Sequence, residues 1–137
     1  MPQLLLDTHT WLFLEMGERR RIPPYVQRQL ERGFRSGSVS ISAISIWELG
    51  VLTRQRITLT KPLEEWITDA IGNSNLYVHA VDERIALRAA RLPGSFRSDP
   101  ADHLIVATAL VTGATLVTAD TRIQEYAEQG FLKVLAL

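Results

Sequence analysis

Four acidic residues have the type and spacing needed for phosphodiester chemistry: Asp7, Glu48, Asp102 and Asp120. Asp7 directly follows the apolar run 4–6, and Asp120 directly follows the run 115–119. If both runs are parallel strands of one sheet, the two aspartates lie at the edge where ligands bind. Asp102 falls in the first turn of the expected helix that leads into the second run.

Four converging carboxylates repel each other, and the usual result is raised pKa values or a bound cation. The chain has no cysteine, and a site with only oxygen ligands suits Mg²⁺ or Mn²⁺. Such an ion activates water and neutralises the charge that develops on phosphate oxygens. The set therefore predicts metal-dependent hydrolysis of a nucleic-acid phosphodiester bond.

Helix capping accounts for three of these acids equally well. Asp7 and Asp120 each precede an expected helix, where a carboxylate accepts hydrogen bonds from free backbone N–H groups. Asp99 is expected as an N-cap with Pro100 as the first helical residue, which puts Asp102 at the acidic position of a capping box. For these residues the sequence leaves both roles open.

Glu48 is the acid that capping cannot explain. It stands in the middle of an expected helix over 43–56, and Ile44, Val51 and Leu52 share its face. An unpaired buried carboxylate is strongly destabilising, so such a group is normally paired, protonated or bound to metal. An arginine partner and a place in a carboxylate site are the two explanations.

The elements that must position these acids alternate between short apolar runs and longer helical patterns. Strands are expected over 4–6, 39–41, 76–80, 115–117 and 132–135, and helices over 10–15, 24–34, 43–56, 62–71, 82–92, 99–111 and 121–129. Continuous Leu, Val and Ile in the strands is typical of a sheet buried on both faces. The alternation predicts a single α/β domain over 1–137, a three-layer α/β/α sandwich with a mainly parallel five-stranded sheet.

Composition narrows the classes of function. The formal net charge is +0, which argues against a protein that coats nucleic acid by bulk electrostatics. The apolar run after Met1-Pro2-Gln3 is too short for a signal peptide, and no run is long enough to span a membrane. A cytoplasmic protein is expected. Arg84, Arg88 and Arg91 share one helical stripe, which is either a solvated face or a surface for phosphate or a partner.

Four motifs follow one another along the chain: Leu5-Leu6-Asp7-Thr8-His9-Thr10, Ser42-Ala43-Ile44-Ser45-Ile46-Trp47-Glu48-Leu49, Asp99-Pro100-Ala101-Asp102-His103-Leu104-Ile105-Val106-Ala107 and Leu116-Val117-Thr118-Ala119-Asp120. In this order they resemble the PIN-domain nucleases, and more narrowly the VapC-like toxins of bacterial toxin–antitoxin pairs. The resemblance covers essentially the whole chain. It implies a Mg²⁺- or Mn²⁺-dependent endoribonuclease that forms a homodimer and is blocked by a cognate antitoxin protein.

The resemblance also implies roles for individual residues. Asp7, Glu48, Asp102 and Asp120 become the metal-binding and catalytic quartet, with Asp99 as an extra ligand and Thr118, Thr8 and Ser45 as supporting hydroxyls. His9 and His103 flank two of the acids and are either substrate contacts or local hydrogen-bonding groups. Arg84 and Arg88 are candidate substrate contacts. Ser42 is expected to cap a helix, Trp47 and Trp66 to lie in the core, and Trp11 to be either core or stacking platform.

The resulting hypothesis is an RNA hydrolase that leaves a 5′-phosphate and a 3′-hydroxyl, because activated water and not the ribose 2′-hydroxyl is the nucleophile. A phosphoaspartyl phosphatase is a second enzymatic interpretation. It would favour a second aspartate two residues after Asp7, where the chain has His9. A non-catalytic partner-binding or regulatory domain of similar fold is the third, and a missing acid would be its signature. None of the four acids is missing.

Overall fold

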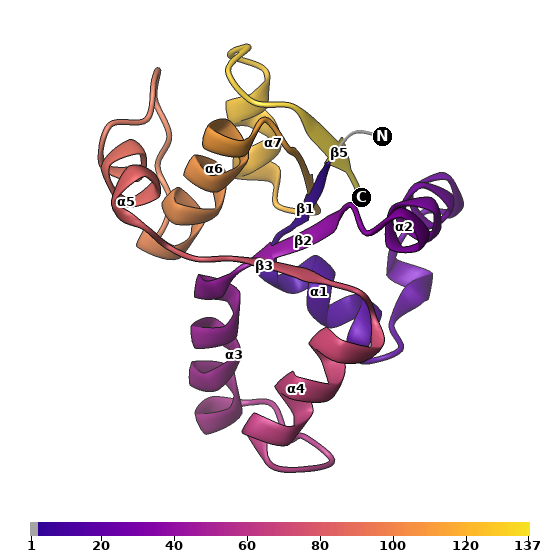
Figure 1. The fold of residues 1–137 in the computed structure, drawn as a ribbon. Coiled ribbons are helices and arrows are strands. Elements are labelled where there is room, and N and C mark those ends of the chain that lie inside the picture. The colour runs from indigo at the N-terminus through magenta and orange to yellow at the C-terminus, as the bar shows by residue number, and fades with distance from the viewer. Residues whose placement is uncertain (1–2) are drawn as a thin grey trace.

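The chain folds around a five-stranded sheet in which every pair of neighbouring strands is parallel. The structure is a computed structural model and describes residues 3–137. Met1 and Pro2, part of the segment from which no signal peptide is expected, lie outside the described residues. Figure 1 shows α1, α3 and α4 on one side of the sheet and α5, α6 and α7 on the other. The predicted α/β/α sandwich with five strands is confirmed, and its sheet is entirely parallel.

The elements follow one another with short connections. The strands are β1 (Leu4–Leu6), β2 (Val39–Ser42), β3 (Tyr77–His79), β4 (Thr115–Thr118) and β5 (Val134–Ala136). The helices are α1 (Thr8–Glu15), the 3₁₀ helix η1 (Arg19–Arg21), α2 (Pro24–Ser36), α3 (Ala43–Gln55), α4 (Leu63–Asn73), α5 (Glu83–Ala90), α6 (Pro100–Thr112) and α7 (Thr121–Ala127).

The central strand β1 divides the core between the two faces of the sheet. Because side chains alternate along a strand, Leu4 and Leu6 pack with helices α1 to α4, while Leu5 packs with α6 and α7. All three leucines are buried. This burial on both faces is the reason that the strand lacks an alternating polar pattern.

The strand order β3-β2-β1-β4-β5 determines where a site can form. The chain builds outward from β1 to β2 and β3, then returns to place β4 and β5 on the other side of β1. The helices that follow β1 and β4 therefore leave the sheet on opposite faces, and the carboxyl ends of these two strands form the switch point at which ligands bind in such sheets. Asp7 follows β1, and Asp120 lies two residues beyond β4.

Several expectations need correction. The first helix begins at Thr8, two residues earlier than expected, because Asp7 caps it directly. The 3₁₀ helix η1 was not predicted, and β5 begins two residues later than expected. Trp47 was expected in the core but is 62% exposed, because the buried face of α3 is set by Ser45 and Leu49. Because successive residues of a helix are rotated by about 100° around its axis, residue 47 points away from that face.

The other two tryptophans lie in the core. Trp11 is fully buried, and its ring meets the Trp66 ring edge-on at 5.8 Å between centroids. Trp66 is half-buried and packs against the same cluster, so the prediction for Trp66 is confirmed.

Candidate functional site

Asp7 is the most deeply buried acid of the four, with 6% of its surface exposed. Its Oδ1 accepts the Thr10 backbone N–H at 2.9 Å, which makes it the N-cap of α1. Its Oδ2 accepts a hydrogen bond from the Thr118 hydroxyl. Burial raises the pKa of Asp7, and the hydrogen bonds from Thr118 and Thr10 oppose that rise. The capping role is real, but it occupies only one of the two carboxylate oxygens.

Glu48 is half-buried on α3 and is held by hydroxyl groups. The Thr8 hydroxyl donates to its Oε1, and the same Thr8 oxygen lies 2.8 Å from the Ser45 hydroxyl. Among the described residues Glu48 forms no ion pair, so the arginine partner considered from the sequence is wrong. Burial raises the pKa of Glu48, the Thr8 hydrogen bond opposes this, and the charges of Asp102 and Asp99 raise it further.

Asp102 stands in the first turn of α6 behind the cap residue Asp99. Oδ1 of Asp99 accepts the Asp102 backbone N–H at 3.0 Å, as the capping pattern predicted. The Asp102 carboxylate itself accepts a hydrogen bond from the Ser98 hydroxyl. Burial raises the pKa of Asp102, the Ser98 hydrogen bond lowers it, and the negative charges of Asp99, Asp120 and Asp7 raise it.

Asp120 caps α7 and is joined to Asp7 through Thr118. Its Oδ1 accepts the Arg122 backbone N–H at 2.8 Å, and its Oδ2 lies 3.7 Å from the Arg122 guanidinium. The Asp120 backbone N–H donates to the Thr118 hydroxyl at 2.9 Å, and that hydroxyl in turn donates to Asp7. One buried threonine at the end of β4 thus fixes two acids at the switch point of the sheet.

The four acids form one electrostatic group. Besides burial, the charges of Asp7 and Asp120 raise the pKa of Asp102, and the charge of Asp102 raises the pKa of Glu48. Such influence between like charges is expected where carboxylates share a partly desolvated neighbourhood. Residues from α3, from α6 and from the ends of β1 and β4 therefore converge at the edge where ligands bind in parallel sheets.

The donor set fits a hard divalent cation in its chemistry, since it consists of carboxylate oxygens that repel one another. Within residues 3–137, however, no three His, Asp or Glu side chains are already spaced to hold a metal ion. Asp7, Glu48 and Asp102 instead each accept a hydroxyl hydrogen bond, from Thr118, Thr8 and Ser98 respectively. An ion would have to draw the free oxygens inward from these positions.

The two histidines flanking the site differ. His103 has Nδ1 2.9 Å from the Asp99 carbonyl oxygen and Nε2 3.2 Å from that of Phe96, and its ring packs on Phe96. That places it as a local hydrogen-bonding group. His9 is exposed. Besides the dominant burial, a positive charge at His9 lowers the pKa of both Asp7 and Glu48, so its ring borders the acids.

The arginine stripe lies on α5 and its C-cap. Arg84, Arg88 and Arg91 are exposed, and none of them forms an ion pair within the described part of the chain. Helix α5 packs mainly against α6, the helix that carries Asp102. The stripe is thus adjacent to the element that positions the site, but the structure does not bring it among the carboxylates.

Ser98 is the contributor that the sequence did not single out. Its hydroxyl contacts Asp102 from the residue before the helix cap, four positions earlier in the chain. A hydroxyl residue immediately before an Asp-Pro cap is a signal that could have been used, because the chain at that point turns back over the first helical turn.

The chain is similar to known proteins over most of its length. The model of the PIN domain family matches residues 4–129. The chain is 32% identical to Ribonuclease VapC22 of Mycobacterium tuberculosis over 127 residues, which covers 92% of this chain and 93% of that protein.

Solved structures share the fold. DNA-bound VapBC from Salmonella typhimurium has a chain that superimposes with a TM-score of 0.71 at 19% identity, covering 99% of this chain and 98% of that one. VapBC2 from Rickettsia felis gives a TM-score of 0.69 at 20% identity, with 98% of both chains covered. FitAcB from Neisseria gonorrhoeae gives a TM-score of 0.64 at 23% identity, covering 97% of this chain and 96% of that one.

Proposed function

The chain belongs to the PIN-domain family, among the VapC-type ribonucleases, and on that premise we propose that Asp7, Glu48, Asp102 and Asp120 form its active site. The reaction is hydrolysis of an RNA phosphodiester bond. Mg²⁺ or Mn²⁺ is the proposed cofactor, since the site offers only oxygen donors.

The observation that carries this proposal is the coupling of the acids. Three of the four positions have a capping role or stand beside a cap, so their presence alone does not indicate catalysis. Caps scattered over a surface do not influence one another. Here the charges of Asp7 and Asp120 act on Asp102, and that of Asp102 acts on Glu48. Raised pKa values from burial and like charge are typical of functional sites.

The residues of the chain have distinct tasks. Asp7 and Asp102, held by Thr118 and Ser98, present oxygens that would bind the ion, and Asp120 and Glu48 complete its surroundings directly or through water. Asp99 is a further candidate ligand. The bound cation supplies charge neutralisation on the phosphate and activation of water. Water attack leaves a 5′-phosphate and a 3′-hydroxyl, and His9 is positioned at the rim to contact the substrate strand.

Partner binding follows from the same premise. The similar solved structures include toxin–antitoxin complexes, and we propose that a cognate antitoxin protein covers the acidic site of this chain. A homodimer is proposed as its assembled form.

Within residues 3–137 no helix is long and apolar enough to cross a membrane.

The decisive experiment compares Asp102→Asn with the parent and with Asp82→Asn. Asp82 is also a helix N-cap, and its Oδ1 accepts the Ile85 backbone N–H at 3.0 Å, but it caps α5 outside the acidic group. Cleavage of a structured RNA in Mg²⁺ should fall by at least about 100-fold in Asp102→Asn and stay at the parent rate in Asp82→Asn. Equal rates for all three proteins would refute the assignment of the site.

A further inference from the structure

A cavity lined by several polar side chains opens at the end of α1 that lies opposite the acids. Its volume is about 390 Å³, within the range of small-molecule sites. Asp7 caps the first residue of α1, and Glu15, the last residue, lines the cavity. An eight-residue helix spans roughly 12 Å. The cavity is therefore a separate place on the molecule, connected to the acids by one rigid element.

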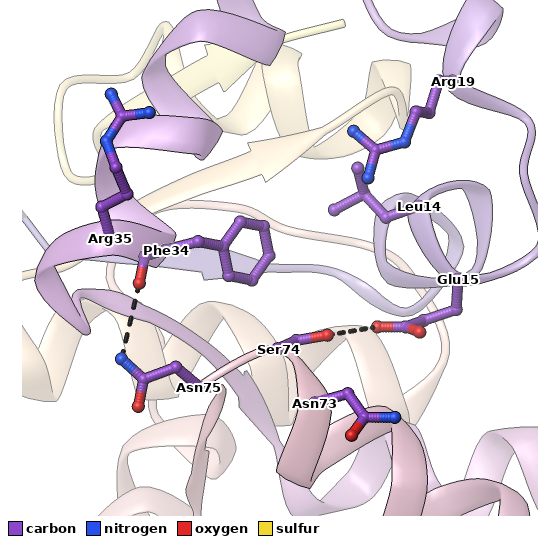
Figure 2. A pocket seen from close by; sticks show the side chains of 8 residues that line it. All are labelled: Leu14, Glu15, Arg19, Phe34, Arg35, Asn73, Ser74 and Asn75. Carbon is purple, nitrogen blue, oxygen red and sulfur yellow. Dashed lines mark hydrogen bonds between the residues drawn. The ribbon is translucent and has the colours of Figure 1, made fainter.

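The cavity is lined by one aromatic ring and two arginines. Figure 2 shows the Phe34 ring pointing into the middle of the group, with Arg35 on one side and Arg19 and Glu15 on the other. Neither arginine forms an ion pair with any residue in the described range 3–137. Exposed guanidinium groups on η1 and α2 that form no ion pair in this range are suited to bind a phosphate or carboxylate from outside.

Glu15 adds an acceptor to this basic setting. It is half-buried, and the Ser74 hydroxyl donates to its Oε1 at 3.3 Å (Figure 2). No cation in the described residues lies within ion-pair distance of it. A smaller cavity of about 170 Å³ shares Glu15 and Asn73 with the first, so the groove continues past the carboxylate. The lining thus offers two cations, a stacking surface and a carboxylate acceptor together.

We propose that this cavity binds a nucleotide, with guanine preferred as the base. Arg19 and Arg35 would hold its phosphate, the Phe34 ring would stack on the base, and the Glu15 carboxylate would accept the two N–H groups of the guanine Watson–Crick edge. Adenine and the pyrimidines do not present such a pair of adjacent donors. If a bare anion bound here instead, its negative charge would face the Glu15 carboxylate with no N–H group between them.

The inference rests on the proposed function in one respect, namely that the nucleotide belongs to the RNA that is cut. The cavity would then select RNAs with a guanosine some nucleotides away from the scissile phosphate. A free guanine nucleotide acting as an effector uses the same chemistry, and an acidic segment of a protein partner is the competing occupant.

The test titrates the metal-free parent protein with GMP, AMP, inorganic phosphate and a poly-glutamate peptide, following backbone amides by NMR. GMP should shift the amides of Glu15, Phe34 and Ser74 and bind about tenfold tighter than AMP. Glu15→Gln should abolish that preference, and Arg35→Gln should weaken both nucleotides. Arg32→Gln is the matched control, an exposed arginine on the same helix that does not line the cavity. It should change nothing.

Three outcomes would overturn the inference: phosphate alone binding as tightly as GMP, GMP shifting only amides near Asp7 and Asp102, or the peptide shifting the cavity amides while GMP does not. A six-nucleotide RNA containing one guanosine separates the two supporting cases. If this RNA binds more tightly than GMP and Arg35→Gln weakens its binding, the cavity is a substrate subsite. If GMP binds more tightly than the RNA, the cavity is an effector site. Cleavage in Mg²⁺ is measured independently. GMP binding without cleavage would contradict only the proposed function, and cleavage without GMP binding only this inference.

Discussion

Replacing Asp7 by Asn should stabilise the metal-free protein while it destroys activity. Asn is as good an N-cap as Asp, so the acceptor for the Thr10 N–H is kept. The carboxylate accepts a hydrogen bond from the Thr118 hydroxyl, whereas the amide that replaces it would donate one to that hydroxyl. This reversal should cost about 1 kcal/mol. Against this, the variant removes a buried charge whose pKa is raised by desolvation.

Removing an uncompensated buried charge should outweigh that cost, and the net gain in unfolding free energy should be about 1–3 kcal/mol at neutral pH. For a chain of 137 residues, each kcal/mol raises Tm by roughly 3–4 °C, so Tm should rise by about 3–12 °C in EDTA. The pH dependence has a definite sign. A carboxyl whose folded pKa lies above its unfolded value of 3.8 binds more protons when folded, so parent stability falls as pH rises from that value through the folded pKa.

The assay is thermal unfolding in EDTA at pH 5 and pH 7.5, followed by circular dichroism. The parent should be more stable at pH 5 than at pH 7.5, and Asp7→Asn should reduce that difference. Added Mg²⁺ should then stabilise the parent but not the variant, by linkage. Asp82→Asn makes the same chemical change at an exposed cap and should leave Tm within about 2 °C. An Asp7→Asn protein that melts at or below the Asp82→Asn control would refute the reasoning.

Three further predictions concern the groups around the acids. Thr8→Val removes the hydroxyl that contacts Glu48 and Ser45 and should lower the unfolding free energy by about 1–2 kcal/mol, as measured by urea titration. Ser98→Ala removes a hydrogen bond that lowers the pKa of Asp102. The pH midpoint of Mg²⁺ binding should therefore move upward, and an unchanged midpoint would show that the serine does not act on the site. The Arg84→Glu/Arg88→Glu double variant should weaken RNA or antitoxin binding in filter and pull-down assays, whereas unchanged affinity for both would leave the stripe a solvated face.

Local patterns made the elements predictable, because caps and breakers act within a few residues. Asp7, Asp82 and Asp99 each accept the backbone N–H three residues later, and Gly113 ends α6 in the left-handed conformation. Ser42 caps α3, as expected. These signals need no knowledge of the fold.

The contacts that assemble the site depend on tertiary structure. The family resemblance named Thr118 and Thr8 as supporting hydroxyls, but no local pattern could assign the acid that each one contacts. Thr118 and Asp7 are 111 residues apart, and Thr8 and Glu48 are 40 apart. They meet because β4 pairs with β1 and because α3 leaves the end of β2 beside α1. Nothing in one sequence states that strand order. The prediction for Trp47 was wrong for a related reason. Its hydrophobicity suggested burial, whereas the helical period set by Ser45 and Leu49 turns the ring outward.

Capping and catalysis are not competing roles for the aspartates of this site. Asp7 and Asp120 each use Oδ1 for a backbone N–H at the start of a helix, and this leaves Oδ2 directed elsewhere. The positive ends of the helices help to keep these carboxylates ionised although they repel one another. Because Asn supplies the capping oxygen but not the charge, Asp→Asn variants separate the two roles. The folded state should survive them, and any function that requires the negative charge should not.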